Sequence, residues 1–278
     1  MPAIRAFMLA AAFIGLTLLS VPVQYFSIRL GLRLQKTYPH AYHRLLCRVF
    51  GIRLTIFGTP VKDRGVLMVA NHASYFDILI MSAAAHVCFV AREDVKGWLL
   101  FGLMARLQRS VFIERARRSQ SGQARDELRR RLLAGDAIVL FPEGTSTDGN
   151  HVLAFKSALM GAAETEIAKD AGGNPVYVPV QPVSITYVGM QGIPLGREYR
   201  PLFTWFGDME LLPHLWEALK TGPLDVVVEF HPPLTVGPGL DRKRLAAQAE
   251  AVIRAGQGRA LNGGFGLIGG RSPAETAA

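Results

Sequence analysis

The chain has 278 residues, of which 50% are hydrophobic and 19% are charged, a composition that fits a single α/β domain with a membrane-attached end. The formal net charge is +9, but the segment up to Lys62 holds eight of the 31 basic residues and none of the 22 acidic ones. The excess charge is therefore N-terminal, which argues against a nucleic-acid binder. Cys47 and Cys88 form no C-x-x-C pair and no Cys/His ligand spacing, so neither a disulfide framework nor a zinc site is indicated.

The first predicted element is a helix over the uncharged run from Ala6 to Ile28. At 1.5 Å per residue it extends about 35 Å, enough to cross a hydrocarbon core of roughly 30 Å. More basic residues follow the run than precede it, so the positive-inside rule places the downstream domain in the cytoplasm, at the inner (cytoplasmic) membrane. The same basic stretch suits the head groups of anionic membrane lipids. Pro22 is compatible with a spanning helix and with one that lies in a single leaflet.

A cleaved signal peptide fits this segment less well, because the apolar run is long and no A-x-A-like site ends it. The next stretch, Tyr38 to Phe50, mixes aromatic and basic residues and is predicted to be a short helix at the membrane interface. Residues 1–50 are thus expected to form membrane-attachment helices.

A folded domain is predicted over residues 51–262, followed by a weakly ordered tail over residues 263–278. Apolar runs predict strands at 52–57, 66–70, 87–90, 111–113, 137–141, 176–187 and 226–230. Helices are predicted between them, at 78–85, 97–107, 120–133, 155–167 and 242–255, with Gly135 as a C-cap. This alternation indicates an α/β layer structure with a largely buried sheet.

The first candidate site is the sequence from Val66 to Asp77, in which an apolar strand ends at Asn71 and His72. On one continuous helix, a five-residue offset would turn His72 and Asp77 about 140° apart, so a direct contact requires an intervening turn. Such a contact would fix the imidazole tautomer and leave Nε2 free to accept a proton. The alternative interpretation is a histidine that merely ends a strand and an aspartate that begins a helix.

The second candidate site is the run from Ile138 to Thr147, where a strand leads into Pro142, Glu143 and Gly144. Gly144 permits a close backbone turn. Glu143 directly follows a buried strand, a costly position for a carboxylate unless it has a partner or a task. An ordinary strand exit with a solvated glutamate is the alternative.

Together the two sites resemble the glycerophosphate and lysophospholipid acyltransferase family. Its N-H-x4-D and F-P-E-G-T signatures appear here as Asn71 to Asp77 and as Phe141 to Thr145. Two further blocks are similar, the one ending in Arg115 and the short apolar one around Pro179. The resemblance covers about residues 50 to 235 and implies an αβα sandwich with an N-terminal membrane-anchoring helix.

The resemblance also implies the chemistry. His72 would be the general base that takes the proton of the acceptor hydroxyl, while Asp77 holds the imidazole. Arg115, Glu143, Gly144 and Thr145 would shape the acceptor site. The co-substrate would be an acyl carrier protein or coenzyme A thioester, with no metal and no other cofactor, and a long apolar tunnel is expected to measure the acyl chain.

The acceptor is expected to be a lysolipid, and two departures from the family pattern bear on which one. Ser146 stands where members with phosphate-containing acceptors usually carry arginine, and Arg109 stands where the second block commonly has glycine. Residues 145–150 and 155–159 are similar to bacterial lyso-ornithine lipid acyltransferases, whose acceptor is zwitterionic, free of phosphorus and carries a 3-hydroxyacyl group. Lysophosphatidic acid is the alternative acceptor, since Arg109, Arg115 and Lys156 also suit a phosphate.

The sequence also bears on how the acyl donor binds and on other classes of protein. The arginines between Arg115 and Arg131 suit an acidic carrier protein or the phosphates of coenzyme A, but the later ones equally suit a solvated helix face. A hydrolase with a nucleophilic serine lacks a G-x-S-x-G elbow. A non-enzymatic lipid-binding module would make both motifs structural.

Overall fold

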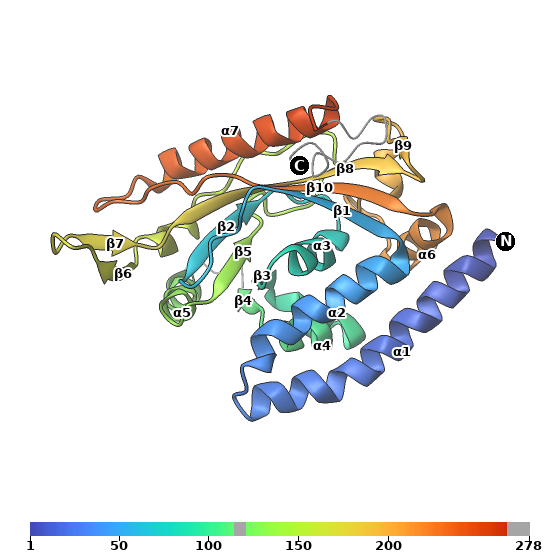
Figure 1. Cartoon of the computed structure of the whole chain (residues 1–278), viewed down its shortest axis with the longest axis horizontal. Coiled ribbons are helices and arrows are strands. Elements are labelled where there is room, and N and C mark those ends of the chain that lie inside the picture. The colour runs from blue at the N-terminus through green and yellow to red at the C-terminus, as the bar shows by residue number, and fades with distance from the viewer. Residues whose placement is uncertain (114–120, 266–278) are drawn as a thin grey trace, which may run out of the picture.

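The computed structural model describes residues 1–113 and 121–265. The chain begins with two helices, α1 (Pro2–Arg29) and α2 (Leu34–Phe50), which lie side by side (Figure 1). Among the described residues, α1 alone is long and apolar enough to cross a membrane, by length and composition. The two predicted N-terminal helices are therefore present. Most of the predicted weakly ordered tail, residues 266–278, lies outside the described residues.

A twisted sheet forms the centre of the domain. Its strands follow the order β1-β10-β8-β2-β5-β3-β4, with β9 paired to β8. Their bounds are β1 (Ile52–Phe57), β2 (Val66–Ala70), β3 (Cys88–Arg92), β4 (Val111–Ile113), β5 (Ala137–Leu140), β8 (Val180–Met190), β9 (Ile193–Pro194) and β10 (Leu224–Phe230). Strands β2, β5, β3 and β4 are mutually parallel, so their carboxyl ends meet at one edge of the sheet.

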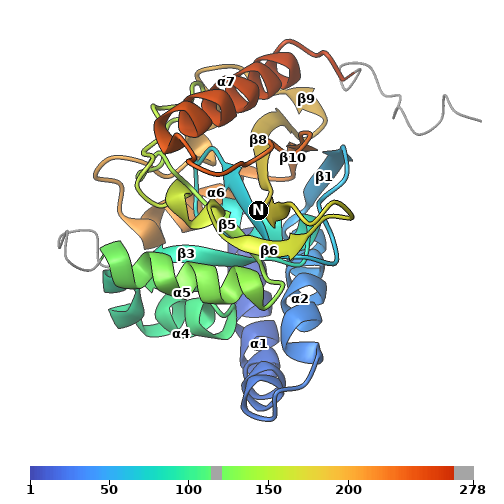
Figure 2. The same ribbon diagram turned by 90° about the vertical axis from the view of Figure 1, so that its left-hand side faces the viewer.

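Helices cover both faces of this sheet, as the predicted αβα arrangement requires (Figures 1 and 2). The remaining helices are α3 (Phe76–Ala84), α4 (Leu99–Leu107), α5 (Ser121–Leu133), α6 (Leu211–Thr221) and α7 (Arg242–Leu261), with short 3-10 helices η1 (Glu93–Gly97), η3 (Met160–Ala163) and η4 (Arg200–Leu202). Helices α2, α3 and α6 pack on one face, whereas α5 and α7 pack on the other.

Strand β2 shows how the sequence builds both layers. Its five residues are all fully buried. Side chains alternate between the two faces of a strand, and helices cover both faces here. Met68 joins the core shared with α2 and α3, whereas Leu67 and Val69 join the core shared with α5 and α7. A continuously apolar run is therefore the pattern that a strand covered on both sides needs.

Two predicted elements are wrong in detail. The predicted strand 176–187 is divided at Val178 and Pro179 into β7 (Pro175–Tyr177), which lies in a separate two-stranded sheet, and β8, which lies in the central sheet. Residues 155–167 do not form a helix. The N–H of Phe155 donates to Glu250 and that of Lys156 to the Pro142 carbonyl, so the start of this segment is tied to α7 and to the loop after β5. The segment instead contains η3 and the start of β6 (Glu166–Lys169).

Candidate active site

His72 and Asp77 lie in direct contact at the carboxyl end of β2. Their atoms Nδ1 and Oδ2 are 2.8 Å apart, because residues 73 to 75 form a turn before α3 begins. The imidazole is 23% exposed, whereas the carboxylate is fully buried. With the proton of Nδ1 shared with Asp77, Nε2 carries the lone pair that can accept a proton.

Four donors hold the Asp77 carboxylate. Besides His72, the backbone N–H groups of Ala73 and Ser74 donate to Oδ2, at 2.7 and 2.9 Å. The hydroxyl of Tyr187 on β8 donates to Oδ1 at 2.7 Å. A buried charge with this many donors is held in one orientation. Tyr187 was not predicted from the sequence, because it lies in an apolar strand 110 residues away, with no local pattern to mark it.

Asn71 fixes the same turn to the sheet. Its side-chain amide donates to the carbonyl of Ile185 and accepts from the N–H of Ile185, both at 2.8 Å. The side chain is 2% exposed, so it replaces two ladder hydrogen bonds where β2 has ended. Asn71 thus sets the position of His72 from the neighbouring strand.

Glu143, which follows β5, supports the backbone on the other side of His72. Its Oε1 accepts from the N–H of His72 at 2.7 Å, and its Oε2 accepts from the N–H of Leu153 at 2.8 Å. Burial raises the pKa of this carboxyl to about 7, although the two hydrogen bonds oppose the shift. The predicted acid after a buried strand therefore has partners, and they are backbone groups.

The other residues of this loop lie around the imidazole. The Phe141 ring stacks on the His72 ring, with centroids 4.2 Å apart. Gly144 has a φ of 79°, and its N–H donates to the Phe141 carbonyl, so the expected close turn is present. The Pro142 carbonyl accepts from Lys156. Pro179 lies away from the site, where its carbonyl accepts from Leu67.

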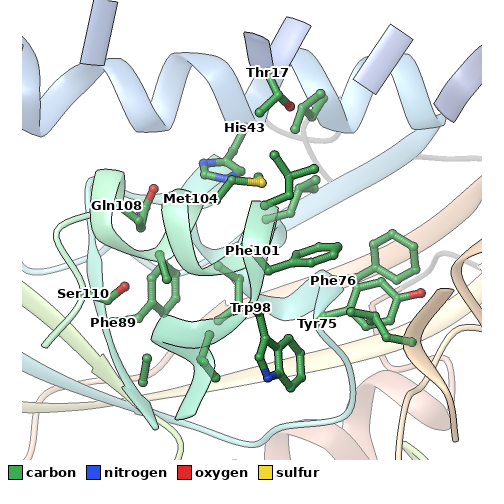
Figure 3. Close-up of a pocket in the computed structure, with 18 of the residues that line it drawn as sticks. Thr17, His43, Tyr75, Phe76, Phe89, Trp98, Phe101, Met104, Gln108 and Ser110 are labelled. Atoms are coloured by element: carbon green, nitrogen blue, oxygen red, sulfur yellow. The ribbon is translucent and has the colours of Figure 1, made fainter. Parts of the chain in front are cut away.

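An apolar cavity of about 740 Å³ opens beside His72. Figure 3 shows its wall between Thr17 and His43 of the N-terminal helices, Phe101 and Met104 of α4, and Tyr75. Gly144, Thr145 and Ser146 line it next to the turn that carries His72, and α6 closes one side. Trp98 and Trp205 meet edge to face across its rim, 6.4 Å apart. The cavity therefore has the size and polarity to hold alkyl chains.

Of the residues considered above for or against a phosphate-containing acceptor, only some line the cavity. Ser146 lines the cavity and its hydroxyl donates to the Trp205 carbonyl. Arg109, in contrast, is not among the cavity-lining residues; it contacts Asp136 at 3.0 Å. Its φ of 59° lies in the left-handed region, which explains why glycine suits the position. Lys156 is exposed and also outside the cavity lining.

Part of the arginine-rich stretch can be placed. Arg115, Arg117 and Arg118 lie outside the described residues. On α5, Arg130 pairs with Glu127, and Arg131 pairs with Asp136. These two arginines thus have acidic partners within the fold. Across residues 1–113 and 121–265, no group of three or more His, Cys, Asp or Glu side chains is arranged to hold a metal ion.

Known proteins share this sequence and fold. The acyltransferase family profile matches residues 53–186. The lyso-ornithine lipid O-acyltransferase of Brucella abortus is 44% identical over 91% of this chain and 93% of its own length. That of Rhizobium meliloti is 39% identical, over 91% and 84%. The 1-acyl-sn-glycerol-3-phosphate acyltransferase of Neisseria gonorrhoeae is 31% identical, over 70% and 71%.

One solved structure has a similar fold. The 1-acyl-sn-glycerophosphate acyltransferase of Thermotoga maritima superposes with a TM-score of 0.60, covering 93% of this chain and 94% of the other, at 22% identity. At that identity the likeness concerns the fold alone.

Proposed function

The chain belongs to the acyltransferase family, and we propose that it transfers a fatty acyl group from a thioester to the 3-hydroxyl of lyso-ornithine lipid, yielding ornithine lipid. It is a lysolipid acyltransferase. We also propose which residues catalyse the transfer and how α1 binds the membrane.

His72 and Asp77 carry the proposed chemistry. Nε2 of His72 takes the hydroxyl proton while the oxygen attacks the thioester carbonyl. A C–O bond forms, the tetrahedral intermediate collapses, the C–S bond breaks, and the imidazolium returns the proton to the leaving thiolate. Asp77 stabilises the imidazolium through Nδ1. The nucleophile belongs to the substrate, so no acyl-enzyme forms.

The single observation that carries the acceptor assignment is Ser146. At the position where phosphate-using members usually carry arginine, this chain has a hydroxyl that donates to the Trp205 carbonyl. No guanidinium is therefore available there for a bidentate phosphate contact. The names of the relatives from Brucella and Rhizobium support the same acceptor.

Purified protein in mixed micelles tests this assignment. Acyl carrier protein and coenzyme A thioesters are offered separately, each with lyso-ornithine lipid or lysophosphatidic acid. We expect transfer to lyso-ornithine lipid, and Ser146→Arg should raise the relative use of lysophosphatidic acid. Ser157→Arg, outside the cavity lining, is the matched control. Preference of the unmodified chain for lysophosphatidic acid would contradict the acceptor assignment.

We further propose that α1 lies in the cytoplasmic leaflet of the inner membrane without crossing it. Polar side chains fasten α1 to the domain along its length. Arg5 donates to the Leu219 carbonyl, Thr17 contacts the Tyr42 hydroxyl at 2.6 Å, and Gln24 donates to the Leu107 carbonyl at 2.8 Å. A helix that left the domain to span a bilayer would lose these contacts.

The opposite side of α1 is apolar and exposed. Phe7, Leu18, Leu19 and Phe26 are each more than half exposed, an arrangement suited to the acyl region of one leaflet. Because α1 also lines the cavity, a lipid in that leaflet is next to the site.

A single cysteine near the N-terminus tests this topology. Ala3→Cys is treated with a membrane-impermeant maleimide in spheroplasts and after lysis, with Glu166→Cys as the cytoplasmic control. The in-plane arrangement predicts labelling of both introduced cysteines only after lysis. The native Cys47 and Cys88 are buried, so they should add little background labelling. Labelling of Ala3→Cys in intact spheroplasts would mean that α1 spans the membrane.

A further inference from the structure

Two charged side chains, Arg92 and Asp94, line the cavity that contains His72. They are its only lysine, arginine, aspartate or glutamate among the described residues of the chain. One is a cation and the other an anion, so this part of the rim presents both signs with no net charge. A dianionic phosphomonoester would find one cation and one repelling carboxylate here.

The topology places the two charges within reach of a bound acceptor. Arg92 ends β3, and β3 is separated from β2 by β5 alone. These strands are parallel, so Arg92 and His72 lie at the same edge of the sheet. Two strand spacings amount to roughly 10 Å. An ornithine head group amide-linked to a 3-hydroxyacyl chain can span this distance when extended.

The side chains of Arg92 and Asp94 form an ion pair with each other. Nε and Nη2 of Arg92 donate to Oδ1 and Oδ2 of Asp94, at 3.0 and 2.8 Å. Their side chains are 60% and 50% exposed. Ion pairs this exposed contribute little to stability, so a ligand with one carboxylate and one ammonium can replace the pair with two new ones. The planar guanidinium fork suits a carboxylate, and the carboxylate suits an ammonium.

We propose that Arg92 and Asp94 form the head-group subsite for a zwitterionic acceptor. Arg92 binds the α-carboxylate of the ornithine moiety, and Asp94 binds its δ-ammonium. This subsite rests on the proposed function, in that the acceptor is lyso-ornithine lipid. Ser146 argues against a phosphate-containing acceptor, and the Arg92 and Asp94 subsite would favour a zwitterionic one.

Three acceptors test the two contacts separately. They are lyso-ornithine lipid, the corresponding norvaline lipid without the δ-ammonium, and the corresponding ornithine amide without the carboxylate. The unmodified chain should prefer the full zwitterion over either analogue by about 10- to 100-fold in kcat/KM, the usual range for a charge-assisted hydrogen bond. Arg92→Gln should no longer prefer the full zwitterion over the amide, but should still prefer it over the norvaline lipid. Asp94→Asn should no longer prefer the full zwitterion over the norvaline lipid, but should still prefer it over the amide.

The chain offers a matched control pair. Arg53 and Asp225 form an ion pair with two hydrogen bonds away from the cavity lining. Arg53→Gln and Asp225→Asn make the same chemical changes and should keep both preferences. Thermal unfolding of all four variants shows whether each is folded.

The outcomes separate this inference from the proposed function. If the unmodified chain acylates lyso-ornithine lipid but Arg92→Gln and Asp94→Asn keep both preferences, the subsite is wrong and the acceptor assignment stands. If each variant loses both preferences equally, the pairing of groups is wrong. If the unmodified chain does not use lyso-ornithine lipid, both proposals are overturned.

Discussion

The hydroxyl of Tyr187 donates to Asp77 at 2.7 Å, on the carboxylate oxygen that His72 does not use. Tyr187 lies on β8 and is 1% exposed, and burial raises its pKa well above the ordinary value. The hydroxyl therefore stays protonated and donates throughout the working pH range. Through this contact, the central sheet determines the orientation of the carboxylate that holds His72.

Tyr187→Phe should lower kcat, because Asp77 would lose the contact that orients its carboxylate toward His72. Without this donor, one buried carboxylate oxygen is unpaired at a cost of about 1–3 kcal/mol. Steady-state kinetics measures the change. The exposed Tyr199→Phe is the control. An unchanged kcat in Tyr187→Phe would limit Tyr187 to packing.

Asn71→Ala should destabilise the fold by about 2–5 kcal/mol, because it leaves both backbone groups of Ile185 buried without partners. Denaturant unfolding in detergent measures the change. Asn71→Asp keeps the acceptor for the Ile185 N–H but sets a buried carboxylate oxygen against the Ile185 carbonyl, so it should lose at least as much. A loss below about 0.5 kcal/mol in Asn71→Ala would show that the loop does not depend on this clamp.

Glu143→Gln should change how stability depends on pH. The carboxyl pKa is about 7 in the fold against an ordinary value of 4.5, so between these values the native state holds a proton that the unfolded state releases. Stability from this group therefore falls as pH rises through that window. The glutamine variant lacks this term. Its free energy of unfolding, relative to the unmodified chain, should rise by up to about 3 kcal/mol from pH 4.5 to 7.

Unfolding at several pH values checks this linkage, with the exposed Glu166→Gln as the control. A flat difference between Glu143→Gln and the unmodified chain would mean that Glu143 ionises normally in the fold. A difference that falls with pH would mean that its backbone hydrogen bonds outweigh its burial.

Arg109→Gly should keep acyl transfer within about twofold of the unmodified rate. The guanidinium does not line the cavity, and Asp136 keeps its contacts with Lys36 and Arg131. Glycine also suits the left-handed backbone at this position. Acceptor KM values for both lysolipids are the measurement. A tenfold rise in KM would place Arg109 in acceptor binding.

The fold was predictable where one local pattern decides the structure. Strands β2 and β5 are uninterrupted apolar runs that end at turn residues, and the structure has both. Helix α6 was not predicted. Pro213 lies in its first turn, where the missing N–H is tolerated. The helix predicted at 155–167 is absent, and Phe155 and Lys156 instead contact Glu250 and Pro142, which no local pattern indicates.

The candidate site was predictable in its motif residues and not in its supports. His72, Asp77 and Glu143 could be named because each follows an apolar strand or its turn. Tyr187 and the Ile185 backbone contact this motif from more than 100 residues away. Arg92 and Asp94 likewise line the same cavity as His72 only through the order of strands in the sheet. Such relationships depend on topology, which a single sequence does not specify locally.

The proposed mechanism depends above all on His72, oriented by Asp77, as the general base of acyl transfer. Single-turnover transfer to lyso-ornithine lipid can be measured with purified His72→Ala and Asp77→Asn, each shown to be folded. We expect rates lower by about 10²- to 10⁴-fold in both variants, with no acyl group attached to the protein. A rate for His72→Ala close to that of the unmodified chain, or a trapped acyl-enzyme, would contradict it.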